Sequence, residues 1–294
     1  MPRPDLFIGI TSFNSARFLS ACLKSIANTT DGLQVRVGVI DNCSTDASAA
    51  VAREAGAEVE VRACSQPDAI NRLLNRSPAP FTLVVHADVV LLGDRWFDTC
   101  RGPLRENCVL VSPEDIGLGP FTRGYPGMPE SSFLLFATKP ARRARLLYWK
   151  RRWRVVRIPW RGLDLYGPHV THRLPACLAR SGYTWHAMRV HTSPRTEVPI
   201  YECMLDAANW KPEYARYCYG FGNFYSLDGQ VTHYHNWYNR IDEGISADST
   251  AVHPTDHLPL AFMQVYGTRF LDDYLAGTIR LPQIAEPERC SGVE

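Results

Sequence analysis

The stretch Phe81-Thr-Leu-Val-Val-His-Ala-Asp-Val89 constrains the fold of this chain more than any other. Its apolar and strand-forming residues predict a β-strand that is buried on both faces, as in the middle of a parallel sheet. The run ends abruptly in His86 and Asp88. Because open α/β sheets bind their ligands just beyond the carboxyl ends of their strands, these two residues indicate a binding site rather than a core position.

The first 90 residues alternate between strand and helix patterns. The expected strands are Leu6–Phe13, Val35–Ile40, Glu58–Ala63 and Phe81–Val85. The expected helices are Ser15–Asn28, Ala47–Ala55 and Asp68–Asn75. Repeated β-α-β units imply a parallel sheet with right-handed crossovers. This part of the chain is therefore expected to be a Rossmann-like nucleotide-binding half.

Beyond Gly93 the pattern is less regular. The expected elements are strands at Val109–Ser112, Ser132–Thr138 and Tyr183–Met188 and a helix at Val170–Arg180. A Gly/Pro-rich loop, residues 117–129, separates the first two of these strands. A loop of that length is expected to be functional rather than a simple connection.

The composition is that of an ordinary globular protein: 294 residues, 45% hydrophobic, 21% charged and a net charge of +2. No apolar run approaches the roughly 18 residues that a membrane helix needs, and the N-terminal residues lack the apolar core of a signal peptide. Nine cysteines are scattered without a CxxC pair, which argues against a disulfide framework or a zinc ribbon. We therefore expect a cytoplasmic protein, and the near-neutral charge argues against a nucleic-acid partner.

One segment departs from this neutrality. Residues 139–161 hold ten basic and no acidic side chains, and Leu146, Trp149, Trp153 and Val156 recur at helical spacing. One interpretation is a solvated amphipathic helix whose aromatic stripe packs on the core. The other is a surface for an anionic partner, such as a lipid phosphate, a membrane surface, a carrier protein or a nucleotide diphosphate.

Four polar motifs follow the predicted strands in chain order. They are Thr11-Ser-Phe-Asn14, Asp41-Asn-Cys-Ser-Thr-Asp46, Ala69-Ile-Asn71-Arg72 on the third crossover, and His86-Ala-Asp88. Together these motifs resemble the N-terminal half of family 2 glycosyltransferases of the GT-A fold, which carry an Asp-x-Asp motif after the fourth strand. The resemblance covers residues 5–92 and extends more loosely to His191. It implies an α/β fold with a mostly parallel central sheet flanked by helices.

The resemblance implies a nucleotide site. Asp41 would accept the imide N–H of a uracil, and Thr11, Phe13 and Asn14 would form the wall beneath the base and ribose. The other residues that it assigns to the nucleotide are Asn42, Ser44, Asn71, His86, Ala87 and Asp88. The alternative for Asp41 and Asp46 is local, because Asp and Ser commonly cap turns and the helices that follow them.

The resemblance also implies a divalent cation. Asp88 would ligate Mn²⁺ or Mg²⁺ bridging the donor phosphates, and the cation would neutralise charge on the departing nucleoside diphosphate. His86 departs from the family pattern because it replaces the first carboxylate of Asp-x-Asp. It could hydrogen-bond a ribose hydroxyl or ligate Mn²⁺ itself. The lost negative charge is expected to weaken cation binding.

A later histidine is expected to complete the metal site. His233 and His235 share one side of a predicted strand at i and i+2, and we prefer this pair. His191, at the end of an earlier strand pattern, is the alternative. The competing interpretation is that all three are ordinary hydrogen-bonded histidines in aromatic surroundings.

The catalytic base has the weakest signal. Inverting family members carry a Glu-Asp pair before a helix that ends in Gly-Tyr or Gly-Trp, and this chain has Gly182-Tyr183 without the pair. Asp164, expected at a loop-to-helix junction, is the candidate base. A structural role in helix capping or in pairing with a nearby arginine is the alternative. Glu114 and Asp115 are in reserve.

The resemblance suggests how the chain is organised. We expect a catalytic domain at residues 1–195, with a nucleotide-binding half at 1–92 and an acceptor half at 93–195. An aromatic- and histidine-rich extension at 196–294 should pack on the donor site, ending in a loose tail from about residue 282. Residues 220–240 are expected to close over the bound nucleotide as a lid.

The implied function is transfer of a sugar from a nucleoside diphosphate sugar, with UDP as the expected nucleotide, to a small-molecule, lipid-linked or carrier-bound acceptor, with inversion. A sugar-nucleotide pyrophosphorylase is an alternative, although Ile8-Gly-Ile-Thr-Ser-Phe-Asn14 lacks the Gly-rich loop with Arg and Lys of those enzymes. A catalytically silent, nucleotide-sugar-binding protein of the same fold is the other, because His86 and the missing Glu-Asp pair both depart from the family.

Overall fold

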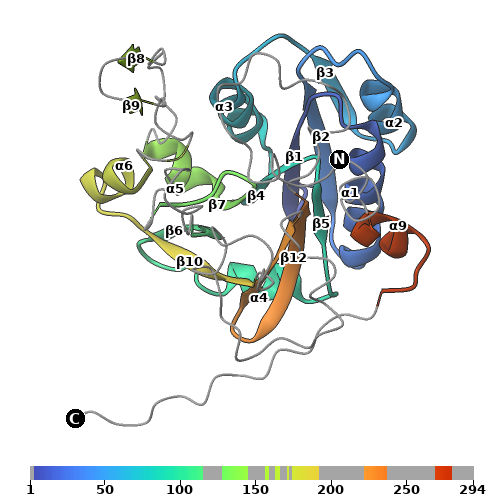
Figure 1. The fold of residues 1–294 in the computed structure, drawn as a ribbon. Coiled ribbons are helices and arrows are strands. Elements are labelled where there is room, and N and C mark those ends of the chain that lie inside the picture. The colour runs from blue at the N-terminus through green and yellow to red at the C-terminus, as the bar shows by residue number, and fades with distance from the viewer. Residues whose placement is uncertain are drawn as a thin grey trace.

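The computed structural model describes residues 3–114, 128–144, 156–158, 163–165, 171, 174–191, 222–236 and 269–279, with backbone only for 156–158 and 163–165. The described strands form a ten-stranded mixed sheet and a separate two-stranded sheet. Helices lie on both faces of the large sheet (Figure 1). This is the GT-A arrangement that the sequence predicts.

Four parallel strands form the N-terminal half of the large sheet. They are β1 (Leu6–Ser12), β2 (Val35–Asp41), β3 (Glu58–Val61) and β4 (Phe81–His86), in the order β3-β2-β1-β4. The connecting helices are α1 (Ala16–Thr29), α2 (Ser48–Glu54) and α3 (Gln66–Arg76). The strand order reverses between β1 and β4, which is the switch point where such sheets bind ligands.

Alternate residues of β1 pack into two different cores. Ile8 and Ile10 pack with α1 and α2, whereas Phe7 packs on the opposite face with α3. Gly9 permits a close approach of α3, because a Cβ at that position would lie 2.9 Å from the Cβ of Leu73. The central strand is thereby covered on both sides, as its continuous apolar sequence requires.

The second half of the sheet has strands of mixed direction. β7 (Phe133–Ala137) is antiparallel to β4 and to β6 (Cys108–Pro113), and β10 (Thr184–His191) is parallel to β6. The helices here are α4 (Trp96–Arg101), α5 (Thr138–Arg143) and α6 (Leu174–Arg180). Sequence patterns predict these three strands and α6, but α6 begins four residues later than expected.

A hairpin of C-terminal residues completes the sheet. β11 (Gly222–Leu227) and β12 (Gln230–Asn236) are joined by Asp228 and Gly229, whose φ angles of 48° and 74° suit the two-residue turn that joins hairpin strands. The order continues β4-β7-β6-β10-β11-β12-β5, where β5 is Val89–Leu91. The expected lid at 220–240 is therefore wrong for residues 222–236. They are buried between two neighbouring strands and cannot open without breaking the sheet.

The basic segment is not one long helix. α5 ends at Arg143, and Val156 belongs to β8 (Val156–Ile158), which pairs with β9 (Leu163–Leu165). The β-branched pair Val155-Val156 and the proline at position 159 favour an extended chain over a helix at this point. Residues 145–155, with half of the basic side chains, lie outside the described part.

Helix α9 (Arg269–Leu275) packs beside α1 (Figure 1). Arg17 of α1 pairs with Asp272 at 2.9 Å, and Phe270 stacks on Tyr234 of β12 with ring centroids 3.8 Å apart. This helix therefore holds the outer face of the hairpin. The tail expected to be loose, from about residue 282, lies outside the described residues.

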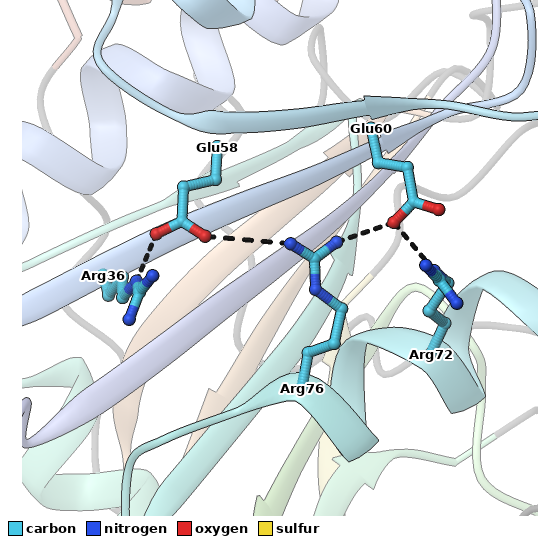
Figure 2. A network of polar contacts seen from close by, with 5 residues as sticks. All are labelled: Arg36, Glu58, Glu60, Arg72 and Arg76. Carbon is cyan, nitrogen blue, oxygen red and sulfur yellow. Dashed lines mark hydrogen bonds and ion pairs between the residues drawn. The ribbon is translucent and has the colours of Figure 1, made fainter.

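Charged side chains cover the edge strand β3. Figure 2 shows Glu60 receiving Arg72 Nε and Arg76 Nη1, each at 2.7 Å, while Glu58 pairs with Arg36 and Arg76. The hydrogen bond from Arg72 is the main cause that lowers the pKa of Glu60. Exposed ion pairs stabilise little, but charges along an edge strand oppose pairing with another chain.

Candidate active site

A cleft opens at the carboxyl ends of the parallel strands, across the switch point between β1 and β4. Its lining residues are Thr11, Ser12, Phe13, Ser15, Ile40, Asn42, Cys64, Gln66, Ala69, His86, Ala87 and Asp88. The cleft encloses about 630 Å³, including the part that is open to solvent. Phe13 is 40% exposed, so its ring is available to a flat ligand.

Four of the residues predicted to bind nucleotide do not line this cleft, and three of them lock two loops together. Asp41 accepts hydrogen bonds from the backbone N–H and the hydroxyl of Ser44, at 2.8 and 2.5 Å. Ser44 Oγ accepts the N–H of Asn14 at 2.9 Å, and Asn14 Oδ1 accepts the N–H of Thr45 at 2.8 Å. Asp41 is only 1% exposed. Its visible contacts are those of the turn-capping alternative.

The fourth is Asn71, which is half-buried in α3 and is not among the residues that line the cleft. Asn42 does line the cleft, and its Oδ1 accepts the N–H of Cys64 at 2.8 Å. That contact holds the segment after β3 against the end of β2. Asn42 therefore shapes the cleft wall as well as facing it.

Asp46 is a capping residue, as the local alternative predicts. One carboxylate oxygen accepts the N–H of Ala16 at 2.9 Å, and the other accepts the N–H of Ser48 at 2.9 Å. Partial burial alone would raise the pKa of Asp46, but the hydrogen bonds from Ser48 and Ala16 outweigh it and lower the pKa. One carboxylate thus caps the first turns of both α1 and α2.

His86 and Asp88, which line the cleft, meet His235, which lies beside them outside the lining. Each offers a ligand atom within 4.8 Å of the other two, and in the described part of the chain they are the one group of three or more such residues. His235 Nε2 lies 3.4 Å from Asp88 Oδ1, and the His86 and His235 rings meet edge to face at 5.6 Å. Residues 149 positions apart therefore form one site.

The register of β12 on β5 brings His235 to Asp88. His235 lies opposite Val89, and the N–H of Asn236 donates to the carbonyl of Asp88 at 3.0 Å. A shift of one residue would turn His235 to the other face of the sheet. The hairpin is thus a structural part of the site.

Two carboxylates flank His235. Its Nδ1 lies 3.1 Å from Glu130 Oε1, an ion-pair contact rather than an aligned hydrogen bond, while its Nε2 faces Asp88. Burial alone would lower the pKa of His235, but Asp88 and Glu130 outweigh burial and raise it to about 10. Burial alone would raise the pKa of Glu130, but His235, Ser132 and Tyr225 lower it to about 2. A free site at neutral pH therefore holds an imidazolium between two carboxylates.

The other candidate histidines lie elsewhere. His233 shares a sheet face with His235 but is stacked between Phe133 and Tyr225, at centroid distances of 4.3 and 4.5 Å. It is fully buried, and burial holds its pKa well below the usual value, so it is neutral. His191 Nε2 contacts Ser226 Oγ at 2.7 Å. Neither belongs to the metal-ligating group of the described residues.

The donor set fits a divalent cation. Ligands on opposite sides of a transition-metal ion lie about 4.2 Å apart, so the 4.8 Å spread needs only a small contraction. Two imidazoles and one carboxylate suit Mn²⁺ better than Mg²⁺, which prefers oxygen ligands. Gln66 contacts the Nε2 of His86 and would compete with a metal for that nitrogen.

The candidate bases are less well placed. Asp164 lies in strand β9 opposite Arg157, not at a loop-to-helix junction, and its side chain is outside the described part. The reserve Asp115 is also outside it. Glu114 forms an isolated β-bridge with Pro129. Among the described residues, Asp88 is the one carboxylate that lines the cleft.

Sequence reasoning missed two neighbours of the site, Gln66 and Glu130. Gln66 is the first residue of α3, between the N-cap Ser65 and Pro67. This capping pattern marks the start of a helix, and it could have indicated that Gln66 lies at the edge of the sheet where the cleft opens. Glu130 follows a long loop and has no local pattern. Its position depends on pairing between strands that are distant in the sequence.

The fold places the protein in the GT-A class, with a cleft at the switch point of its sheet. The sequence model of glycosyl transferase family 2 matches residues 7–159, more than half of the chain, and the chain belongs to this family. The match contains β1 to β7 and with them His86, Asp88 and Glu130. His235 lies beyond it. A comparison with curated protein sequences gives no match.

Solved structures with this fold align over part of the chain. They include a mannosyltransferase from Pyrobaculum calidifontis with GDP-Man and Mn²⁺ (16% identity, 49% of this chain and 48% of that one, TM-score 0.40). S. aureus TarS is 17% identical over 50% and 52% of the chains, with TM-score 0.39. Glucosyl-3-phosphoglycerate synthase from Mycobacterium tuberculosis with Mn²⁺ and UDP is 22% identical over 37% and 43%, with TM-score 0.33. This chain spans about half the length of these proteins, and such likeness carries no functional argument.

Proposed function

We propose that this protein transfers a sugar from a nucleoside diphosphate sugar, with UDP as the nucleotide, to a small-molecule, lipid-linked or carrier-bound acceptor. One observation carries the proposal: His235 converges with His86 and Asp88, two residues that line the cleft at the switch point of the sheet. Family membership supports the reaction class. The donor, the acceptor and the stereochemistry are parts of the proposal.

In this proposal the nucleotide lies along the cleft. The exposed ring of Phe13 would stack on the base, and Thr11 and Asn42 would face the base and ribose. The loop lock between Asp41, Ser44 and Asn14 fixes the wall before the ligand arrives. Asp41 is 1% exposed and accepts a hydrogen bond from the Ser44 hydroxyl. A uracil base can therefore reach the Asp41 carboxylate only if the turn around it opens.

Asp88, His235 and His86 would hold the divalent cation, Mn²⁺ in preference to Mg²⁺. When bound, the cation supplies Lewis-acid stabilisation of the leaving diphosphate. The chain's own residues do the rest of the positioning. His235 would give up the proton on Nε2 and offer that nitrogen to the cation, and Asp88 would offer a carboxylate oxygen.

The second half of the catalytic domain would form the side of the site that binds the acceptor. We propose that the acceptor half, residues 93–195, completes the domain begun by the nucleotide-binding half, 1–92, and that the extension 196–294 packs on the donor site through its hairpin. Asp164 is our candidate base for an inverting transfer. The basic segment 139–161 would face an anionic acceptor, carrier or membrane surface. In the described residues no helix is both long and apolar enough to span a membrane.

The test measures donor turnover. The purified protein is incubated with UDP-, GDP- and ADP-sugars and Mn²⁺, and release of nucleoside diphosphate is followed without added acceptor. We expect slow hydrolysis of a UDP-sugar that Asp88→Asn abolishes. The matched control is Asp98→Asn, an exposed carboxylate of α4 that pairs only with Arg101 among the described residues. In a parallel incubation with added pyrophosphate, conversion of the UDP-sugar into UTP and a sugar 1-phosphate would indicate a pyrophosphorylase instead.

A second candidate is a nucleotide-sugar-binding protein without catalysis. It is favoured by the lack, among the described residues lining the cleft, of any carboxylate other than Asp88. Both candidates bind the donor, so turnover separates them. Tight binding of UDP with no hydrolysis and no transfer to any acceptor pool would favour the second.

A further inference from the structure

Glu130 is a nearly buried carboxylate beside the candidate metal site, outside the cleft lining. It precedes β7, and both its backbone N–H and its backbone carbonyl are hydrogen-bonded to the last residues of β6. Its N–H donates to the carbonyl of Pro113 at 2.8 Å, and its carbonyl accepts the Ser112 hydroxyl at 2.9 Å. Only 20% of its side chain is exposed. Burial of a charged carboxylate costs free energy unless hydrogen bonds or opposite charges compensate it.

Tyr225 and His235 contact the two carboxylate oxygens of Glu130. The Tyr225 hydroxyl donates to Glu130 Oε2 at 2.9 Å, and His235 Nδ1 lies 3.1 Å from Glu130 Oε1. The Tyr225 ring is fully buried and stacks on His233, so it has little freedom to move. Both carboxylate oxygens are thus engaged, one by a rigid donor and one by the histidine.

We propose that Glu130 is a positioning residue that orients His235 toward the metal site. This inference rests on the proposed cation role of Asp88, His86 and His235. With Nδ1 turned to Glu130, the Nε2 of His235 faces Asp88 at 3.4 Å and is the atom available to a cation. Histidine ligands are commonly fixed in this way by a carboxylate on the other ring nitrogen.

Charge balance favours the same role. Asp88 and Glu130 together carry two negative charges, which match a divalent cation once His235 is a neutral ligand. The replacement of the family's first carboxylate by His86 removes a charge from the motif, and Glu130 restores one from the segment that precedes β7.

The test is Mn²⁺ titration of the full chain, followed by electron paramagnetic resonance of the free ion, with and without UDP. Glu130→Gln keeps the size of the side chain and an acceptor for Tyr225 but removes the charge. We expect it to weaken Mn²⁺ binding by about 10- to 100-fold, as His235→Gln should. The double variant should lose no more than His235→Gln alone, because Glu130 acts through that ring. The control is Glu58→Gln, an exposed carboxylate on β3, which should bind Mn²⁺ like wild type.

A spectroscopic readout separates positioning from general support of the fold. At saturating Mn²⁺, electron spin echo modulation from ¹⁴N reports imidazole coordination, and Glu130→Gln should reduce it while thermal unfolding stays cooperative. Normal Mn²⁺ affinity and modulation in Glu130→Gln, with a loss in His235→Gln, would overturn the positioning role and leave the cation site intact. A further loss in the double variant would also overturn it. Wild type that binds no Mn²⁺ would refute the cation proposal itself.

Discussion

Alkaline pH should destabilise the metal-free protein through one residue, His235. Its pKa is about 10 in the folded chain against an ordinary 6.5. A raised pKa means that the native state binds the proton more tightly than the unfolded state does. The stabilisation is therefore complete below pH 6.5 and is lost as the pH rises through about 10.

The size of the effect follows from linkage. One pH unit between the two pKa values corresponds to about 1.4 kcal/mol, so the whole span gives an upper limit of about 5 kcal/mol. Between pH 7 and pH 9 the contribution should fall by about 2.5 kcal/mol. That is a large part of the 5–15 kcal/mol that typically separates folded from unfolded chains.

The assay is urea unfolding at pH 7 and pH 9 in the presence of a chelator, followed by tryptophan fluorescence. For each protein, the change in unfolding free energy between pH 7 and pH 9 is measured. The variant's change is then subtracted from that of wild type, because the other titrating groups contribute to both. The pH-dependent change should be much smaller in His235→Gln than in wild type. His186→Gln, which alters an exposed histidine of β10, should retain it. Identical pH dependence in wild type and His235→Gln would refute the buried ion pair between His235, Asp88 and Glu130.

Three further changes test other parts of the account. Phe13→Ala should weaken UDP binding by roughly 1–3 kcal/mol, the value of a base–aromatic stack. Val61→Ala, which alters the other exposed large hydrophobic side chain of the described residues, should not weaken it; calorimetry measures both. Asp41→Ala and Ser44→Ala break the same turn and should each lower thermal stability; a loss of UDP-over-GDP preference in both alike would show that Asp41 acts through the turn alone. Gly222→Ala should cost about 1–3 kcal/mol of unfolding free energy, because its Cβ would lie 2.2 Å from the Tyr234 hydroxyl; an unchanged melting temperature would contradict the hairpin packing.

The N-terminal half could be predicted because its signals are local. Residue patterns no longer than about 15 residues predict the strand that ends at His86, the turn at Asp41 and the helices α2 and α3 between them. The cleft is then a consequence of topology, since parallel strands place their carboxyl ends at one edge. The turn-capping alternative for Asp41 was also readable, because Ser44 stands at the right distance to close that turn.

The rest depends on pairing between distant strands. Nothing within residues 231–236 distinguishes His235 from His233, since both face the same side of β12. Only the register on β5 places His235 at Asp88 and leaves His233 between two aromatic rings. The Asp228-Gly229 turn was a readable hairpin signal that would have argued against a lid. Glu130 has no such signal, because β6, β7 and β12 must be in place before it meets His235.

The central claim is that Asp88 and His235 hold a divalent cation at the donor phosphates. A crystal structure with UDP and Mn²⁺, with data collected at a wavelength where manganese scatters anomalously, tests it directly. We expect an anomalous peak beside the UDP phosphates, at metal–ligand bonding distance from the Asp88 carboxylate and from His235 Nε2. UDP bound in the cleft with no peak there, and with His235 still paired to Asp88, would contradict it.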